Sequence, residues 1–191
     1  DEVGYLTVHS LEEAIACRSA GWTKRIMTVG PLPNAEAEAV FEYDIEPVVF
    51  AKEFLRVVGR LAAKHKRRVL THLKLETGTG RQGIDEREFD RFAAIYKKHP
   101  SLQRPYGASM HFANIEDTLE HDFARLQLHE FERAIDVATA ALSDSTSGDM
   151  GMATARCCQR GGKPGPSMPV SRQNASGKST FSSGTRDAAR G

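Results

Sequence analysis

Cysteine is scarce in this sequence, and its placement excludes two classes of protein. The 191 residues include three cysteines: Cys17 lies in a helical pattern, and Cys157 and Cys158 are adjacent. No spacing matches a zinc site, and the pattern is not the framework of a disulfide-stabilised domain. We therefore expect three reduced thiols in a cytoplasmic protein, and no metal site.

Long apolar runs are also missing. No stretch approaches the roughly 20 residues that a helix needs to span a membrane, and the acidic start, Asp1-Glu2, is unlike a signal peptide. We expect a cytoplasmic protein without a membrane partner. The first residue is not methionine and leads almost at once into a strand pattern, so we also expect a fragment of a longer protein.

Large apolar side chains become rare after residue 142. Residues 1–142 hold 19 Lys and Arg against 22 Asp and Glu, together with the single Trp and every Tyr, Leu and Ile. Residues 143–191 hold seven basic against three acidic residues, with nine Ser and eight Gly. Such a segment cannot bury enough apolar surface to offset the entropy lost on ordering. We predict a folded domain over 1–142 and a disordered tail over 143–191.

Strand and helix patterns alternate five times along the first 142 residues, which favours an α/β protein built from parallel βα units. Ser10 and Glu13 have the spacing of a capping box, in which each side chain accepts from the other's backbone amide, and this predicts the start of the first helix. Gly21 predicts its end. Periodicity alone allows either a barrel or an open doubly wound sheet. The predicted strands are 4–8, 25–29, 47–50, 69–75 and 106–112, and the predicted helices are 11–20, 34–41, 51–66, 85–98 and 118–142.

The most informative segment is 71–84, THLKLETGTGRQGI, in which a buried strand runs into a glycine-rich turn. Glycines 78, 80 and 83 allow positive backbone dihedrals that would fold the chain back over the strand end. This segment resembles the H-L-K-x-D-T-G-M-G-R-x-G motif of the alanine racemases, and 106–113, YGASMHFA, resembles their G-x-x-T-H-F-A strand. The resemblance implies an incomplete parallel (βα) barrel of the TIM type, made of strands two to six of the family's N-terminal domain.

The resemblance also implies roles for three side chains. Arg81 matches an arginine that contacts the pyridoxal phosphate cofactor and the substrate carboxylate. Lys74 matches a strand lysine that is carbamylated in many members and accepts hydrogen bonds from that arginine. His111 matches a histidine in the cofactor pocket. We therefore expect Arg81 and Lys74 as catalytic residues, and His111 and Arg81 as cofactor-binding residues.

Three residues depart from the family motif. Glu76 replaces Asp, Thr79 replaces Met and Gln82 replaces the usual Leu. The first change is conservative, whereas the other two predict looser packing behind Arg81.

The sequence contains no match to the family's K-A-x-A-Y-G-H-G motif, whose lysine binds pyridoxal phosphate covalently. Covalent attachment is therefore not expected here, and the second base of the family belongs to a C-terminal domain of the partner subunit. We expect the intact parent to be a homodimer that interconverts L- and D-alanine, a cell-wall precursor, and the present chain to be inactive. The alternatives are another amino-acid racemase of this fold, or a non-catalytic barrel that binds pyridoxal phosphate or a carboxylate.

Two explanations of the tail stay open. The first is a frameshift. At this point the family continues with a strand containing N-S-A, and codons that encode residues 152–158 can be chosen so that reading from each third base gives N-S-A. The alternative is a basic tail that binds nucleic acid through phosphate contacts. Its charges are sparse and not interleaved with aromatic residues, so we do not expect a nucleic-acid partner.

Overall fold

The computed structural model describes residues 3–103, 105–113 and 121–143 and the two-residue strand 153–154. Residues 1–157 form one compact unit, and a second unit, 158–191, lies outside the described residues. The predicted disorder of the tail therefore falls almost entirely outside the described residues and stays a prediction.

Six parallel strands form one sheet, in which each strand pairs with the next along the chain. The strands are β1 (Tyr5–Val8), β2 (Arg25–Thr28), β3 (Ile45–Val49), β4 (His72–Lys74), β5 (Gly107–Ser109) and β6 (Ala153–Thr154). All five predicted strands are present, in the predicted order and parallel direction. In particular, β4 and β5 are neighbours, with Lys74 opposite Ser109. The sixth strand was not foreseen, because two residues carry no periodicity.

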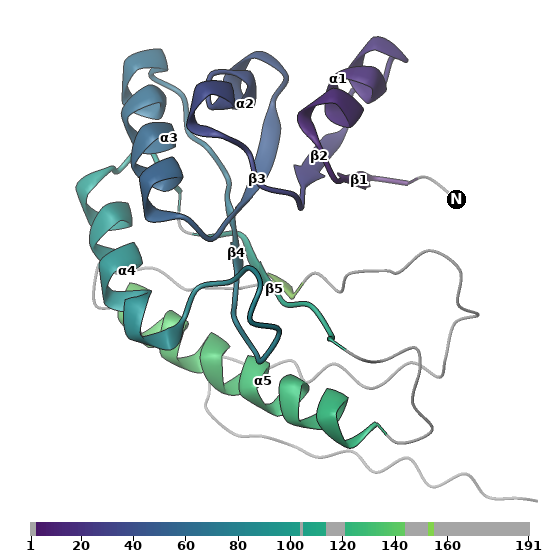
Figure 1. Cartoon of the computed structure of the whole chain (residues 1–191). Coiled ribbons are helices and arrows are strands. Elements are labelled where there is room, and N and C mark those ends of the chain that lie inside the picture. The colour runs from purple at the N-terminus through teal and green to yellow at the C-terminus, as the bar shows by residue number, and fades with distance from the viewer. Residues whose placement is uncertain (1–2, 104, 114–120, 144–152, 155–191) are drawn as a thin grey trace, which may run out of the picture. The chain divides into compact units, whose positions relative to one another are not determined.

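Helices alternate with the strands and lie along one side of the sheet, where Figure 1 shows them as an arc, and from α2 to α5 each packs against the next. The α-helices are α1 (Leu11–Ser19), α2 (Ala39–Glu42), α3 (Lys52–His65), α4 (Phe89–Lys98) and α5 (Asp122–Ser143), with 3-10 turns η1 (Asn34–Glu36) and η2 (Glu86–Glu88). The arrangement confirms an incomplete parallel (βα) barrel. Among the described residues, no helix is long and apolar enough to cross a membrane.

The first helix shows how local sequence sets element boundaries. The Ser10 hydroxyl accepts a hydrogen bond from the Glu13 amide at 3.3 Å, as predicted. The Glu13 carboxylate, however, accepts from the His9 amide at 2.7 Å instead of completing a reciprocal box with Ser10. Gly21 adopts φ +89°, so the expected glycine stop is confirmed.

The main core lies between the sheet and helices α3, α4 and α5. Leu73, Val49 and Ala108 from the sheet contact a cluster that includes Leu55 and Phe92 from the helices. A smaller cluster packs α1 on the first strands. Strand side chains alternate between the two faces of a sheet, and Leu73 faces the helices. His72 and Lys74 therefore lie on the other face, the inner face of the partial barrel.

Polar side chains cross this inner face near the amino ends of five strands: Tyr5, Arg25, Glu46, His72 and Tyr106. We call them the inner polar layer. The Glu46 carboxylate accepts from the Tyr5 hydroxyl at 2.7 Å and from Arg25 Nη2 at 2.7 Å. A carboxylate can only accept, so His72 Nε2, at 2.9 Å, carries the proton and donates to it.

Aromatic rings complete the inner polar layer. The Arg25 guanidinium lies 4.8 Å from the ring centre of Tyr5 and 4.1 Å from that of Tyr106, which are cation–π distances. Burial raises the pKa of the Glu46 carboxyl, but hydrogen bonds from its three partners outweigh burial and lower the pKa to about 2. The layer therefore holds an ionised carboxylate inside the barrel and links β1 to the segment before β5.

Candidate active site

The site begins where β4 leaves the sheet. The Leu75 amide still donates to the Ser109 carbonyl at 2.8 Å, which extends the pairing with β5 by one residue. The chain then departs and returns at Ile84, whose amide donates to the Lys74 carbonyl at 2.8 Å. The Glu76 amide donates to the Ile84 carbonyl at 3.1 Å. Residues 76–84 therefore form a closed loop, the β4 loop, at the carboxyl end of the strand.

One side chain organises the β4 loop from inside. Oε1 of Glu76 accepts hydrogen bonds from three successive backbone amides, those of Gly78 at 2.7 Å, Thr79 at 2.6 Å and Gly80 at 3.0 Å. Hydrogen bonds to an ionised acceptor are stronger than neutral ones. The carboxylate of Glu76 thus stabilises the turn that carries Arg81.

The glycines of the β4 loop serve two purposes. Gly78 and Gly80 adopt φ +104° and +64°, so the prediction of positive dihedrals is confirmed for both. The same prediction is wrong for Gly83, which does not have a positive φ. Gly83 is required by close approach instead, because a Cβ there would lie 2.5 Å from the backbone nitrogen of Glu76.

The three expected site residues meet at the carboxyl ends of β4 and β5. Lys74 and His111 are half-buried, and Arg81 is exposed on the loop between them. Burial lowers the pKa of the His111 imidazole, and the charges of Arg81 and Lys74 lower it further. Arg81 and Lys74 therefore lie close enough to His111 for their charges to act on its imidazole. The positive charges of Arg81 and Lys74 thus lie beside His111 at this edge of the sheet.

Residues 1–155 match the family model described as the N-terminal domain of alanine racemase. The chain belongs to the alanine racemase family. It is 32% identical over 135 residues to the alanine racemase of Treponema denticola, which covers 70% of this chain and 35% of that protein. It is 31% identical over 154 residues to the alanine racemase of Clostridium tetani, covering 74% and 38%.

Solved alanine racemase structures agree with the fold. The structure from Clostridium difficile 630 superposes with a TM-score of 0.66 at 20% identity and covers 81% of this chain and 38% of that one. The structure from D-cycloserine producing Streptomyces lavendulae gives 0.66 at 26% identity, with the same coverage. The chain thus spans between a third and two fifths of the length of these relatives.

Sequence reasoning missed two residues that hold the candidate site together. The hydroxyl of Thr79 donates to the carbonyl oxygen of His111 at 2.9 Å, although the motif comparison suggested looser packing there. The amide of Gln127, on α5, donates to the same oxygen at 3.2 Å. Gln127 is 1% exposed, and a buried glutamine on an apolar helix face was the only signal in the sequence.

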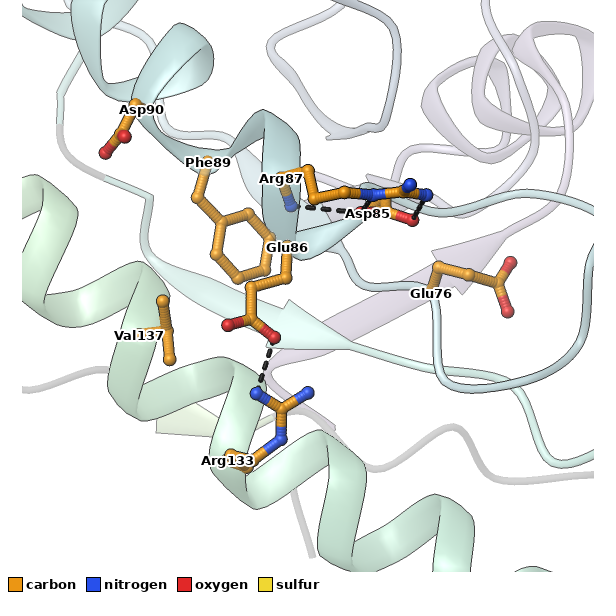
Figure 2. A pocket seen from close by; sticks show the side chains of 8 residues that line it. All are labelled: Glu76, Asp85, Glu86, Arg87, Phe89, Asp90, Arg133 and Val137. Carbon is orange, nitrogen blue, oxygen red and sulfur yellow. Dashed lines mark hydrogen bonds and ion pairs between the residues drawn. The ribbon is translucent and has the colours of Figure 1, made fainter.

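A recess lies between η2, the start of α4 and α5, and Glu76 of the β4 loop lines one part of it (Figure 2). Its charges are largely paired within the protein: Glu86 binds Arg133 at 2.5 Å, and Asp85 binds Arg87 at 2.7 Å. The three expected site residues do not line it. Among the described residues, no group of His, Cys, Asp and Glu could hold a metal ion.

Proposed function

We propose that this chain forms the part of an alanine racemase barrel that binds pyridoxal phosphate and the substrate carboxylate. The observation that supports the proposal most is the clustering of Arg81, Lys74 and His111 at the carboxyl ends of two adjacent parallel strands. In parallel barrels this edge is where chemistry takes place. The names of the relatives indicate the reaction, the interconversion of L- and D-alanine in the intact parent.

The side chains at the site fit the cofactor chemically. Pyridoxal phosphate carries a phosphate and a phenolic oxygen, and an amino-acid substrate adds a carboxylate. Arg81 would bind two of these oxygens at once through its planar guanidinium. Lys74 would add positive charge beside it, and the imidazole of His111, whose pKa is lowered, would add a ring N–H donor. When bound, the cofactor supplies an electron sink for the substrate Cα carbanion.

The proton steps require further groups. Racemisation needs a base on each face of the substrate, within hydrogen-bond reach of Cα. The chain contains no K-A-x-A-Y-G-H-G lysine motif. We therefore propose that residues 1–191 alone bind the cofactor without covalent attachment and produce no D-alanine. Dimerisation and a cytoplasmic location are likewise proposals that follow the family.

A second candidate function is a non-catalytic barrel that binds pyridoxal phosphate or a carboxylate. Arg81, Lys74 and His111 would bind an anion in this case too, without any covalent bond to the cofactor. The nucleotide sequence that flanks this reading frame discriminates between the two. A lysine motif upstream and an N-S-A segment in another frame downstream would indicate a racemase, whereas their absence would indicate a binder.

Equilibrium dialysis against pyridoxal phosphate tests the binding role. We expect Arg81→Ala to weaken binding by about tenfold or more, because a hydrogen bond to a charged group contributes about 1.5–3 kcal/mol. Arg87→Ala is the matched control, since Arg87 is exposed and paired with Asp85 in the other recess. Equal affinity of Arg81→Ala and the wild-type chain would refute the proposed site.

A further inference from the structure

Two side chains from different elements hold one backbone oxygen of the site. Thr79, in the β4 loop, and Gln127, on α5, both donate to the carbonyl of His111, at 2.9 and 3.2 Å. Oε1 of Gln127 also accepts from the Ala113 amide at 2.9 Å. The segment after β5 is thus held at His111 and Ala113, by the β4 loop and by α5.

Thr79 is itself held at its backbone. Its amide is the donor of the shortest of the three hydrogen bonds to the Glu76 carboxylate, at 2.6 Å. Arg81 follows two residues later in the same turn. A shift of Thr79 relative to His111 therefore displaces the arginine relative to the imidazole, because the turn between them is stabilised by the same carboxylate.

The Thr79 hydroxyl is a feature of this chain. The family motif that the chain resembles has methionine at this position, and a thioether has no proton to donate. Thr77, two residues earlier, also has a hydroxyl directed across to the β5 side, but its acceptor is the sulfur of Met110 at 3.3 Å. Of these two threonines, Thr79 is the one whose hydroxyl bonds to the backbone of a site residue.

We propose that Thr79 is a positioning residue, whose hydroxyl links the β4 loop to the His111 carbonyl and thereby sets Arg81 and His111 at the spacing that binds an anion. The consequence for cofactor binding rests on the function proposed above. The link itself is a property of the chain without ligand.

The test compares Thr79→Val, Thr79→Ser and the control Thr77→Val in the full chain. The first readout is the titration of His111 by NMR without ligand, with its signal assigned through His111→Asn. We expect the pKa of His111 to rise in Thr79→Val, because Arg81 moves away, and to stay at the wild-type value in Thr79→Ser and Thr77→Val. A hydroxyl with a merely structural role would alter stability and leave this pKa unchanged.

The second readout is affinity for pyridoxal phosphate by equilibrium dialysis. We expect Thr79→Val to bind about three- to tenfold more weakly, the equivalent of one neutral hydrogen bond, and Thr79→Ser to bind as the wild type does. Thr79→Met, which carries the family's side chain, repeats both measurements if Thr79→Val does not fold.

The two proposals fail in different ways. If the pKa of His111 in a folded Thr79→Val or Thr79→Met variant equals that of the wild type, the positioning role is overturned, whatever the affinity for pyridoxal phosphate. If the wild-type chain does not bind pyridoxal phosphate but the pKa of His111 rises in Thr79→Val, the proposed function fails and the link between the loop and His111 stands. A pKa change of equal size in Thr77→Val would also overturn the role of Thr79, since any hydroxyl of the loop would then suffice.

Discussion

Replacement of Glu46 by glutamine should destabilise the protein near neutral pH and remove part of its acid sensitivity. The Glu46 carboxylate lies in the inner polar layer, is 8% exposed and accepts hydrogen bonds from three side chains. Glutamine has nearly the same shape but no charge and only one oxygen. The substitution therefore tests the ionised carboxylate while changing the packing little.

The expected magnitude comes from the pKa. The carboxyl titrates at about 2 in the folded protein, against an ordinary value of 4.5. Each pH unit corresponds to about 1.4 kcal/mol, so the difference contributes about 3 kcal/mol at most. Its partner Arg25 has a side chain that is 37% exposed, and solvent screens part of this attraction. We therefore expect a loss of about 2 kcal/mol.

The sign with pH follows from linkage. Because the folded-state pKa is depressed, the stabilisation is fully present above about pH 5 and is lost as the pH falls toward 2. The difference in unfolding free energy between wild type and Glu46→Gln should therefore shrink over that window. Urea denaturation at pH 7, 5, 4 and 3 measures it, and other carboxylates cancel in the difference.

Glu53→Gln is the matched control, since Glu53 is an exposed residue of α3 whose ion pair with Arg56, at 3.3 Å, should contribute less than about 0.5 kcal/mol. A Glu46→Gln variant as stable as this control at pH 7 would refute the reasoning. So would a difference from wild type that stayed constant between pH 7 and pH 3.

Three further predictions concern the backbone and the tail. Gly83→Ala should destabilise the protein by about 1–3 kcal/mol, because its Cβ would lie 2.5 Å from the Glu76 nitrogen, while Gly4→Ala meets no atom within 4 Å and should melt at the wild-type temperature; equal melting of the two would contradict the close approach. Arg18 donates to four backbone carbonyls, so Arg18→Lys should lower the unfolding free energy in urea by about 1–3 kcal/mol, and an unchanged midpoint would show that water replaces these bonds. Trypsin should cut after residue 143 before it cuts the body, as the composition predicts, and mass spectrometry that finds the tail intact while the body is cleaved would disprove the boundary.

Much of the fold could be predicted from the sequence, because the relevant signals are local. A strand pattern repeats every two residues and a helix pattern every 3.6, so alternating βα units follow from neighbours along the chain. The motif around Arg81 could also be recognised in the sequence, because glycines at fixed positions in it indicate where the backbone needs a positive φ or a close approach. The pairing of β4 with β5 then followed from parallel topology, and the structure confirms it.

Only the tertiary structure decided which polar groups meet. Glu46 and His72 are 26 residues apart, and Thr79 and the His111 carbonyl are 32 apart. A threonine hydroxyl can bond to its own turn, to water or to a distant carbonyl, and sequence does not rank these partners. The fold determines the partner, because it brings Thr79 of the β4 loop and Gln127 of α5 to the same acceptor, the carbonyl oxygen of His111. The residues that would do the chemistry were visible in the sequence, whereas those that hold them in place appeared only when the chain was folded.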